Sequence, residues 1–238
     1  LCMIGKFSTF LASASASLCF ISSSFAAGGP LKVFILAGQS NMQGQGVVSM
    51  DGERDYNGGK GNLVWSMANS QSKELLAHLK DKDGNWVVRD DVTISYKVND
   101  VVRKGGLTVG FTGYGGASHI GPELGFGDVV GDHYKEPVLL IKTAWGGKSL
   151  FKDFRPPSSG GQVGPCYTQM VEEVRAALGE LGNQKYEIAG FVWLQGFNDM
   201  VDGHTYPDRG KPGRFAVYSD LLSKFIRDVR KDLGVPQM

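Results

Sequence analysis

The stretch LKVFILAGQSNMQGQG, residues 31–46, contains the feature on which the interpretation of the chain depends. After Leu31 and Lys32, five apolar and partly β-branched residues follow without interruption, which is typical of a buried strand in a parallel sheet. The run leads directly into Gly38, Gln39 and Ser40. Gly38 allows a sharp turn because it has no Cβ atom. A serine at a strand-to-helix turn is either an exposed nucleophile or a plain helix cap.

The composition is that of an ordinary globular protein. The chain has 238 residues, of which 42% are hydrophobic and 21% charged, and its formal net charge is +1. This length is sufficient for one large domain with a sizeable core. The absence of a strong charge argues against a nucleic acid, an anionic membrane surface or an acidic protein as partner.

The N-terminal segment has the pattern of a secretory signal peptide. Lys6 precedes an apolar, serine-rich run that is too short for a stable membrane span, and the run ends in Ser24-Phe25-Ala26-Ala27. We expect residues 1–27 to be the signal peptide, residues 28–238 to form one domain, and the protein to be secreted or periplasmic. A disordered tail is the alternative.

Cysteine usage excludes an internal disulfide framework in the mature chain. Of the three cysteines, Cys2 and Cys19 would leave with the signal peptide, and only Cys166 would stay. No histidine lies near Cys166 in the sequence. We therefore interpret it as a small residue at the start of a helix, after Gly164 and Pro165, and not as a nucleophile.

Strand and helix patterns alternate along the chain. Further strands are predicted at residues 91–98, 137–144 and 188–194. Helices are predicted at residues 122–134, 167–181 and 215–233. This alternation predicts an α/β fold of the doubly wound, flavodoxin-like type, with a parallel sheet and helices on both faces. Residues 45–118 are interpreted as an elaborated loop region with a helix over residues 67–79 and a turn at Asp83-Gly84.

Small or amide-bearing residues follow three of the predicted strands. These motifs are Gly38-Gln39-Ser40, Trp145-Gly146-Gly147 and the run from Gln195 to Asp199. Ligands bind at the carboxyl ends of strands in such sheets. Acyl transfer by serine needs hydrogen-bond donors aimed at a developing oxyanion, which a glycine N–H or a side-chain amide can supply. Each motif alone is also compatible with a plain turn. Three such motifs at one edge of the sheet, the rim formed by the carboxyl ends of the strands, favour a functional site.

The same motifs carry a resemblance to a known family. GQSNM at 38–42, TAWGG at 143–147 and WLQGFND at 193–199 resemble blocks of the Ser-Gly-Asn-His (SGNH, or GDSL-like) hydrolase superfamily. They are most similar to the sialate O-acetylesterase-like domain that includes carbohydrate esterase family six, the acetyl xylan esterases. GPELG at 121–125 resembles a further motif of that branch. The resemblance extends over nearly all of the mature chain.

The resemblance implies roles for the residues of the rim. Ser40 corresponds to the nucleophile, and its own N–H to the first oxyanion donor. Gly147, or alternatively Gly146, corresponds to the second donor.

The third oxyanion donor is open between two residues. General SGNH enzymes use the asparagine of Gly-X-Asn-Asp, which matches Asn198. The carbohydrate esterase branch uses the glutamine of Gln-Gly-Glu, which matches Gln195, although Phe197 stands here in place of the glutamate. We favour Gln195 as the donor and Asn198 as a supporting brace.

The base that a serine nucleophile requires is missing from the sequence. The resemblance implies a histidine and its orienting acid in a late Asp-X-X-His segment that follows a last strand. None of the four histidines stands three residues after an aspartate. Residues 234–238 have the pattern of a helix end and the start of another strand. We expect the domain to be incomplete at its C-terminus, without its last strand and with the Asp-His pair beyond residue 238.

Three residues are expected to contact the substrate: His119, Glu123 and Gln39. Glu123 alternatively braces the rim as a first-turn acid that the helix dipole favours, and Gln39 alternatively braces its own loop. Trp145 and the glycine-rich residues 105–116 form either a sugar-stacking wall or, for Trp145, part of the core. No histidine and carboxylate cluster has the spacing of metal ligands, so we expect no metal and no other cofactor.

The sequence thus predicts an exported serine esterase that removes O-acetyl groups from carbohydrate. The acetyl preference comes from the resemblance, and the sugar, xylan or sialic acid among others, stays open. The first alternative is a non-catalytic carbohydrate-binding relative that kept the rim and lost the base. A flavodoxin-like nucleotide binder is a second alternative, but the loop after residue 38 has neither the dinucleotide fingerprint nor the P-loop lysine.

Overall fold

The computed structural model describes residues 29–50, 56–69, 71 and 73–238. The predicted signal peptide, residues 1–27, lies outside these residues. Within the described ranges, every helix is too short or too polar to span a membrane.

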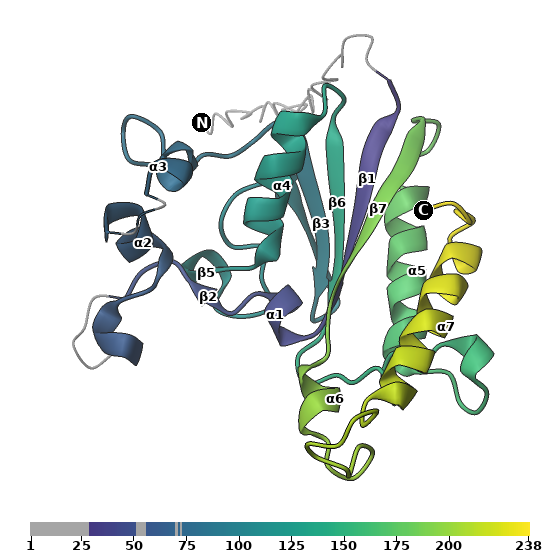
Figure 1. Ribbon diagram of the computed structural model, residues 1–238. Helices are drawn as coiled ribbons and strands as arrows, with labels where there is room; N and C mark the ends of the chain where they lie inside the picture. Colours follow the sequence, from purple (N-terminus) through teal and green to yellow (C-terminus); the bar gives the residue numbers. More distant parts are fainter. Residues whose placement is uncertain (1–28, 51–55, 70, 72) are drawn as a thin grey trace, which may run out of the picture.

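One five-stranded sheet with the order β4-β3-β6-β1-β7 forms the centre of the molecule (Figure 1). Its strands are β1 (Leu31–Gly38), β3 (Val92–Val98), β4 (Val101–Gly106), β6 (Val138–Ala144) and β7 (Tyr186–Leu194). β1 pairs in parallel with β6 and β7, and β3 pairs in parallel with β6. The predicted α/β fold class is confirmed, and the four predicted strands agree with the structure to within two residues at each end.

The sheet differs from the prediction in one strand. β4 was not predicted, and it pairs antiparallel with β3, so the sheet is mixed. The hairpin between them turns at Asn99 and Asp100, which both have positive φ, at 48° and 64°, as hairpin turns of the mirror-image type require. The side chains of β4 are mostly exposed. They therefore give no core signal in the sequence, and the two glycines at the end suggest a loop.

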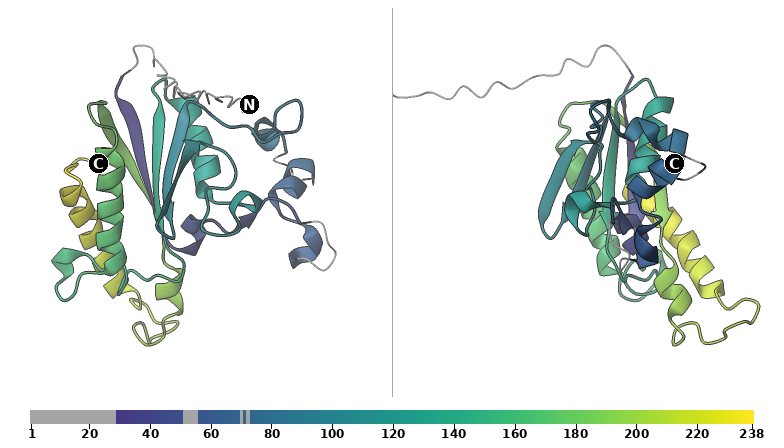
Figure 2. Two further views of the ribbon diagram at one scale, coloured as in Figure 1. Left: turned by 180° about the vertical axis from the view of Figure 1, so that it is seen from behind. Right: turned by 90° about the vertical axis from the view of Figure 1, so that its left-hand side faces the viewer.

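Helices cover both faces of the sheet (Figures 1 and 2). α4 (Pro122–His133) lies on one face, and α5 (Pro165–Gly179) and α7 (Ala216–Asp232) lie on the other. The two prolines occupy first-turn positions, where the missing N–H costs no hydrogen bond. Two short helices, α1 (Ser40–Gln43) and α6 (Phe197–Val201), follow the carboxyl ends of β1 and β7.

Two short helices between β1 and β3 lie outside α4, away from the sheet (Figure 2). They are α2 (Leu63–Asn69) and α3 (Lys73–Leu76), so the single helix predicted over residues 67–79 is wrong in extent. The predicted turn is present, with the Gly84 N–H donated to the Asp81 carbonyl at 3.0 Å. A small antiparallel ribbon joins β2 (Gly46–Val47) to β5 (His119–Ile120). Single 3-10 turns occupy Ala77–Leu79, Gly116–Ser118 and Pro157–Ser159. Tyr56–Gly59 forms a kinked turn with positive φ at Asn57 and Gly58.

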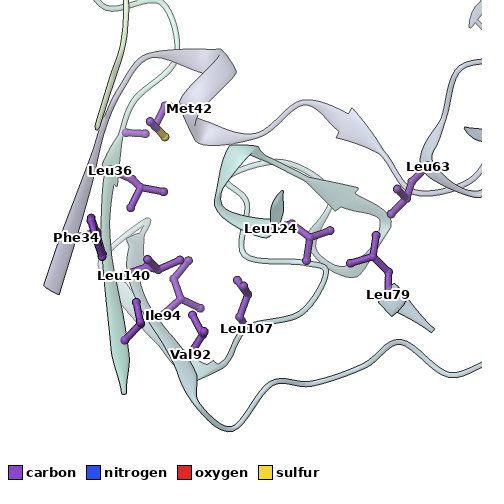
Figure 3. Packing of buried hydrophobic residues seen from close by; sticks show 12 residues of the cluster. Phe34, Leu36, Met42, Leu63, Leu79, Val92, Ile94, Leu107, Leu124 and Leu140 are labelled. Carbon is purple, nitrogen blue, oxygen red and sulfur yellow. The ribbon is translucent and has the colours of Figure 1, made fainter. Parts of the chain in front are cut away.

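Apolar cores fill the space on both sides of the sheet. Figure 3 shows the cluster on the α4 side, where sheet residues such as Leu36 and Leu140 face Leu107 and Leu124. Gly127 lets α4 approach closely, because a Cβ atom there would lie 2.5 Å from Leu107 Cδ2. On the other face an aromatic cluster contains Phe154, Trp193 and Phe225, with ring centroids 5.0 Å apart for Phe154–Trp193 and 4.5 Å for Trp193–Phe225.

The strand register determines what meets at the rim. Gly38 at the end of β1 is level with Ala144 at the end of β6 and with Leu194 at the end of β7. Because these three strands are neighbours and parallel, the residues that follow each of them emerge at the same edge of the sheet. The three polar motifs predicted to form a site therefore emerge side by side.

Candidate active site

Ser40 lies at the tip of the turn between β1 and α1. It is the first residue of α1 and is half-buried. The N-cap position belongs to Gln39, which makes no side-chain cap hydrogen bond, so the interpretation of Ser40 as a capping serine is wrong. The Ser40 carbonyl accepts the N–H of Gly44 at 3.0 Å, which closes the single turn of this helix.

The backbone at the end of β1 is held against β7. A Cβ atom on Gly38 would lie 2.2 Å from the carbonyl oxygen of Leu194, so only glycine fits here. The N–H of Gln39 donates to the same carbonyl at 3.2 Å. The turn that carries Ser40 is therefore fixed directly to the loop that begins after Leu194.

The side chain of Gln39 lies beneath the rim and is only 2% exposed. Its Nε2 donates to Oδ1 of Asn198 at 2.9 Å. Its Oε1 accepts the backbone N–H groups of Gly196 at 3.2 Å and of Asn198 at 3.3 Å. A buried amide that is occupied in this way braces the turn. The geometry therefore supports the bracing alternative for Gln39 and leaves no surface for direct contact with a substrate.

Gln195 is also used as a brace. Its Nε2 lies within hydrogen-bond distance of three acceptors: Asp199 Oδ2 at 2.7 Å, the Lys148 carbonyl at 3.0 Å and Gln39 Oε1 at 3.2 Å. Its Oε1 accepts the hydroxyl of Tyr218 at 3.1 Å. An amide nitrogen has two hydrogens to donate, and here both have protein acceptors. Gln195 therefore has no donor left for an oxyanion.

Asn198 has the opposite arrangement. The two backbone N–H groups that donate to Gln39 fix its Oε1 as the acceptor, so its Nε2 must donate to Asn198. Asn198 consequently accepts through Oδ1. Within the described residues no protein acceptor is recorded for its Nδ2, and the residue is half-exposed. The geometry thus favours Asn198 as the free amide donor and reverses the preference for Gln195 drawn from the resemblance.

Asp199 connects the rim to the loop after β6, a role that the sequence did not reveal. Its carboxylate is 1% exposed and accepts the N–H groups of Leu150 at 2.8 Å and Phe151 at 3.1 Å. It also accepts the hydroxyl of Tyr206 at 3.0 Å. Burial raises the pKa of Tyr206, which keeps this hydroxyl protonated as a donor. The loop that carries Gly146 and Gly147 is anchored by these bonds.

Gly146 lies beside Ser40, whereas the space next to the Cα atom of Gly147 is open. A Cβ atom on Gly146 would lie 3.8 Å from Ser40 Cβ, 3.0 Å from Gln43 Oε1 and 2.6 Å from the hydroxyl of Tyr114. Gly147 has φ +70°, and a Cβ atom there would meet nothing within 4 Å. Positive φ at Gly147 turns the backbone at the rim. Both glycines therefore stay candidates for the second oxyanion donor.

Tyr114 comes from the glycine-rich loop that was predicted to form a wall of the site. The sequence did not single it out, because its only signal is one aromatic residue among glycines. The Tyr114 hydroxyl faces Gly146, because a Cβ atom on Gly146 would lie 2.6 Å from it. The Gln43 side chain lies between the loop of Tyr114 and the loop of Gly146. Trp145 instead packs on Phe154, with ring centroids 5.9 Å apart, at the edge of the core cluster.

The predicted contact residues His119 and Glu123 lie in different surroundings. His119 is half-buried in β5, and its Nδ1 lies 2.9 Å from Ser118 Oγ. Glu123 is fully buried and pairs with Lys142, whose Nζ lies 2.6 Å from Oε2. Glu123 therefore braces the rim, as the alternative had it, and presents no surface to a substrate. Lys142 was counted only as a strand residue in the sequence.

The other histidines have separate positions. His78 pairs with Asp128, with Nε2 2.6 Å from Oδ2. His133 packs edge-on against Tyr134, and His204 is exposed on the loop after α6. In the part of the chain that the structure describes, no recorded contact joins a histidine to Ser40.

Cys166 has the environment of a structural residue. It is 5% exposed near the start of α5, and burial raises the pKa of its thiol to about 11. Among the described residues, no three His, Cys, Asp or Glu side chains are grouped so as to hold a metal ion.

Comparison with known proteins identifies one family. Residues 30–238 match the family model described as carbohydrate esterase, sialic acid-specific acetylesterase. No curated protein matched the chain.

Two solved structures are similar to the fold. A protein from Arabidopsis thaliana has a TM-score of 0.51 at 18% identity, over 88% of this chain and 72% of that one. A protein from Xanthomonas citri, described as a carbohydrate acetylesterase, has a TM-score of 0.48 at 14% identity, over 86% of this chain and 39% of that one. At such identities the likeness to the Arabidopsis structure concerns the fold alone.

Proposed function

The chain belongs to the carbohydrate esterase family of the sialic acid-specific acetylesterase type, and from this premise we propose that it is a serine O-acetylesterase with Ser40 as nucleophile. Members of this family are hydrolases of carboxylic esters on carbohydrates. The proposal adds the nucleophile, the oxyanion donors and the acetyl group as the acyl group removed.

The proposed reaction proceeds through an acyl-enzyme. Ser40 Oγ attacks the ester carbonyl carbon while a histidine accepts the hydroxyl proton. The oxyanion is bound by the N–H of Ser40, by the N–H of Gly147 or Gly146 and by Nδ2 of Asn198. The histidine returns its proton to the departing sugar oxygen. Water, deprotonated by the same histidine, then attacks the acetyl-serine, and acetate leaves as Ser40 regains its proton.

One observation carries this proposal: the amide of Asn198 is oriented by Gln39. The Gln39 amide holds Oδ1 of Asn198 at 2.9 Å, and no acceptor is recorded among the described residues for the donor end of Asn198, Nδ2. Gly38 and Gln39 fix the Ser40 turn to the same loop. A donor held in advance lowers the barrier because it does not have to reorganise during the reaction.

We propose that the base comes from a segment after residue 238, as the resemblance implies. Two features support this. No described histidine has a recorded contact with Ser40. In addition, β7 is an edge strand of the described sheet, and a groove of about 370 Å³ lies beside it, lined mostly by apolar residues of β7 and α7, together with Arg230 and Met238. An unpaired strand edge is a template for a further strand, and in this proposal such a strand leads the chain to the base at the rim.

The family and the N-terminal sequence support a proposal for the substrate class and the location. We propose acetylated carbohydrate, of the xylan or sialate type, as the substrate. The signal-peptide pattern of residues 1–27 supports export to the periplasm or the medium.

Replacement of Ser40 tests the proposal. The full-length protein, including any sequence after Met238, is assayed with p-nitrophenyl acetate, acetylated xylan and O-acetylated sialic acid. Ser40→Ala is expected to abolish acetate release, while Ser219→Ala on the exposed surface of α7 is the matched control. Unchanged turnover by Ser40→Ala would overturn the assignment. Glycan binding without any turnover by the wild type would instead favour the non-catalytic alternative. The observation that supports this alternative is that no described histidine has a recorded contact with Ser40.

A further inference from the structure

Lys142 occupies an unusual place for a charged residue. It lies within β6, whose seven residues are all buried, and it is 1% exposed. Its partner Glu123 lies at the start of α4 and is fully buried. Lysine and glutamate are almost never fully buried unless they are paired, because the loss of hydration is costly. A pair retained in such a place calls for an explanation.

All three donors of the Lys142 ammonium group are used. Nζ donates to Oε2 of Glu123 at 2.6 Å, to the carbonyl of Phe111 at 2.8 Å and to the carbonyl of Gln43 at 3.2 Å. The ring of Tyr96 lies beneath the cation, with its centroid 4.8 Å from Nζ. One side chain therefore joins α1, the loop after β4 and α4.

Glu123 extends this link to the chain before α4. Its Oε1 accepts the N–H of Gly121 at 2.9 Å. Gly121 in turn packs against Gly44, since a Cβ atom on Gly121 would lie 2.9 Å from Gly44 Cα. A Cβ atom there would also lie 2.3 Å from Glu123 Oε2 and 3.0 Å from Lys142 Nζ. The start of α4 is thus pressed directly onto the end of the turn that carries Ser40.

The segments joined by this pair are those that frame the nucleophile. Gln43 is the last residue of α1, the helix that Ser40 begins. Its carbonyl also accepts the N–H of Gly113 at 3.1 Å, and Gly113 precedes Tyr114, whose hydroxyl faces Gly146. The ion pair therefore reaches both the nucleophile turn and the loop opposite to it.

We propose that Lys142 and Glu123 are positioning residues of the esterase site, which hold the Ser40 turn and the Tyr114 loop at the spacing that attack requires. This inference rests on the proposed function for its catalytic consequence. Burial lowers the pKa of Lys142, and the nearby Glu123 carboxylate acts against this effect and favours the ammonium form. A buried ion pair contributes little to stability compared with an apolar pair of the same size. Its role in placing catalytic segments therefore explains its presence better than stability does.

The test uses a double variant without buried charge. Lys142→Met/Glu123→Gln keeps the side-chain volumes and leaves an amide oxygen for the Gly121 N–H. Tyr167→Phe is the matched control, because it removes a part-buried hydrogen bond of 2.7 Å to Asp232 between α5 and α7, on the other face of the sheet. In the full-length protein, the double variant is expected to lose about 10²-fold in kcat with little change in KM, the scale of a small misplacement. The control is expected to keep its kcat.

Amide hydrogen exchange gives a second measurement that does not depend on turnover. The double variant is expected to exchange faster at Gly44, Gly113 and Tyr114, whereas Tyr167→Phe is expected to change only α5 and α7. Unchanged exchange at these three amides overturns the inference, whatever kcat does. The exchange result is independent of the proposed function. If the wild type has no esterase activity and the double variant still exchanges faster at these three amides, the positioning role is supported and the proposed function is rejected.

A second variant covers the case in which the double variant does not fold. Glu123→Gln alone keeps the Lys142 ammonium and its two carbonyl partners. It is expected to show a smaller loss in kcat and faster exchange at the same amides. Wild-type kcat and wild-type exchange in this variant contradict the inference.

Discussion

Gln39 and Asn198 share two hydrogen bonds of opposite sense: the Gln39 amide nitrogen donates to Oδ1 of Asn198 at 2.9 Å, and the Gln39 amide oxygen accepts the Asn198 backbone N–H at 3.3 Å. The two residues are 159 positions apart in the chain. Their contact determines which end of the Asn198 amide is available, and it joins the loop of the nucleophile to the loop of an oxyanion donor.

This geometry predicts different effects for the two amides of the rim. Asn198→Ala is expected to lower kcat by about 10²–10³-fold, as loss of one oxyanion donor does, and to destabilise the fold by about 1–3 kcal/mol, because the buried Gln39 Nε2 loses its acceptor. Gln195→Leu is expected to destabilise the fold by about 1–3 kcal/mol, because it removes one donor of the buried Asp199 carboxylate and the donor of the Lys148 carbonyl. Kinetics and thermal unfolding of both variants check this. A well-folded Gln195→Leu protein with the larger kcat loss would return the donor role to Gln195.

Gly38 at the end of β1 and Gly146 after β6 are expected to respond differently when a methyl group is added. In Gly38→Ala the new Cβ meets the Leu194 carbonyl oxygen at 2.2 Å, and neither strand backbone can move away. We expect a destabilisation of roughly 3 kcal/mol from this overpacking, measured by urea unfolding. A Gly38→Ala protein of wild-type stability would show that β1 and β7 are less closely joined.

Gly146→Ala is expected to change activity without a large change in stability. Its new Cβ meets the hydroxyl of Tyr114 at 2.6 Å, and this side chain can rotate away. The displaced ring and the added methyl beside Ser40 are expected to lower kcat/KM for acetyl esters about tenfold or more. Gly146→Ala/Tyr114→Ala relieves the clash and is expected to recover part of the loss. Equal activity of Gly146→Ala and wild type would show that Tyr114 does not border the acyl site.

The rim could be predicted because glycines and amides at strand ends are local signals, and parallel strands bring their ends to one edge. The roles of the amides could not be predicted. Gln39, Gln195 and Asn198 all have the same chemical groups, and tertiary contacts decide which of them has a free donor: Gln39 meets Asn198 across 159 positions, and Gln195 meets Lys148 across 47. The same limit applies to Lys142, which stands in an apolar strand while its partner Glu123 begins a different element.

β4 shows a limit of a different kind. A strand is recognised in sequence through its buried face, and the side chains of β4 are mostly exposed. Its pairing with β3 is decided by the turn at Asn99 and Asp100, where both residues adopt positive φ. Without a Gly in this turn, the sequence carries only a weak hairpin signal.

Cys166 is expected to resist alkylation in the folded protein. Burial raises the pKa of its thiol to about 11, so the reactive thiolate is scarce at pH 8, and the residue is 5% exposed. Iodoacetamide at pH 8 is expected to label it only after unfolding in guanidinium chloride. Mass spectrometry of the Cys166 peptide in both states checks this and separates it from the N-terminal cysteines. Rapid labelling of the native protein would contradict a buried Cys166.

The start of β3 is expected to make the stability of the fold sensitive to acid. Arg89 donates to both oxygens of Asp91, at 2.9 and 2.7 Å, and these hydrogen bonds hold the Asp91 pKa below its usual value. A carboxylate whose pKa is lower in the folded state contributes stability above its unfolded pKa of about 4, and this contribution is lost as the pH falls through the folded value. Asp91→Asn removes the contribution at every pH. The Tm of wild type is therefore expected to exceed that of Asp91→Asn at pH 6, and this difference in Tm is expected to narrow toward pH 3.

Asp90→Asn is the control. Asp90 is the neighbouring acid, and no ion pair is recorded for it within the described residues. The difference in Tm between wild type and Asp90→Asn is expected not to narrow. A difference in Tm between wild type and Asp91→Asn that stays constant from pH 6 to pH 3 would mean that Asp91 acts at this position through the shape of its side chain, and not through its charge.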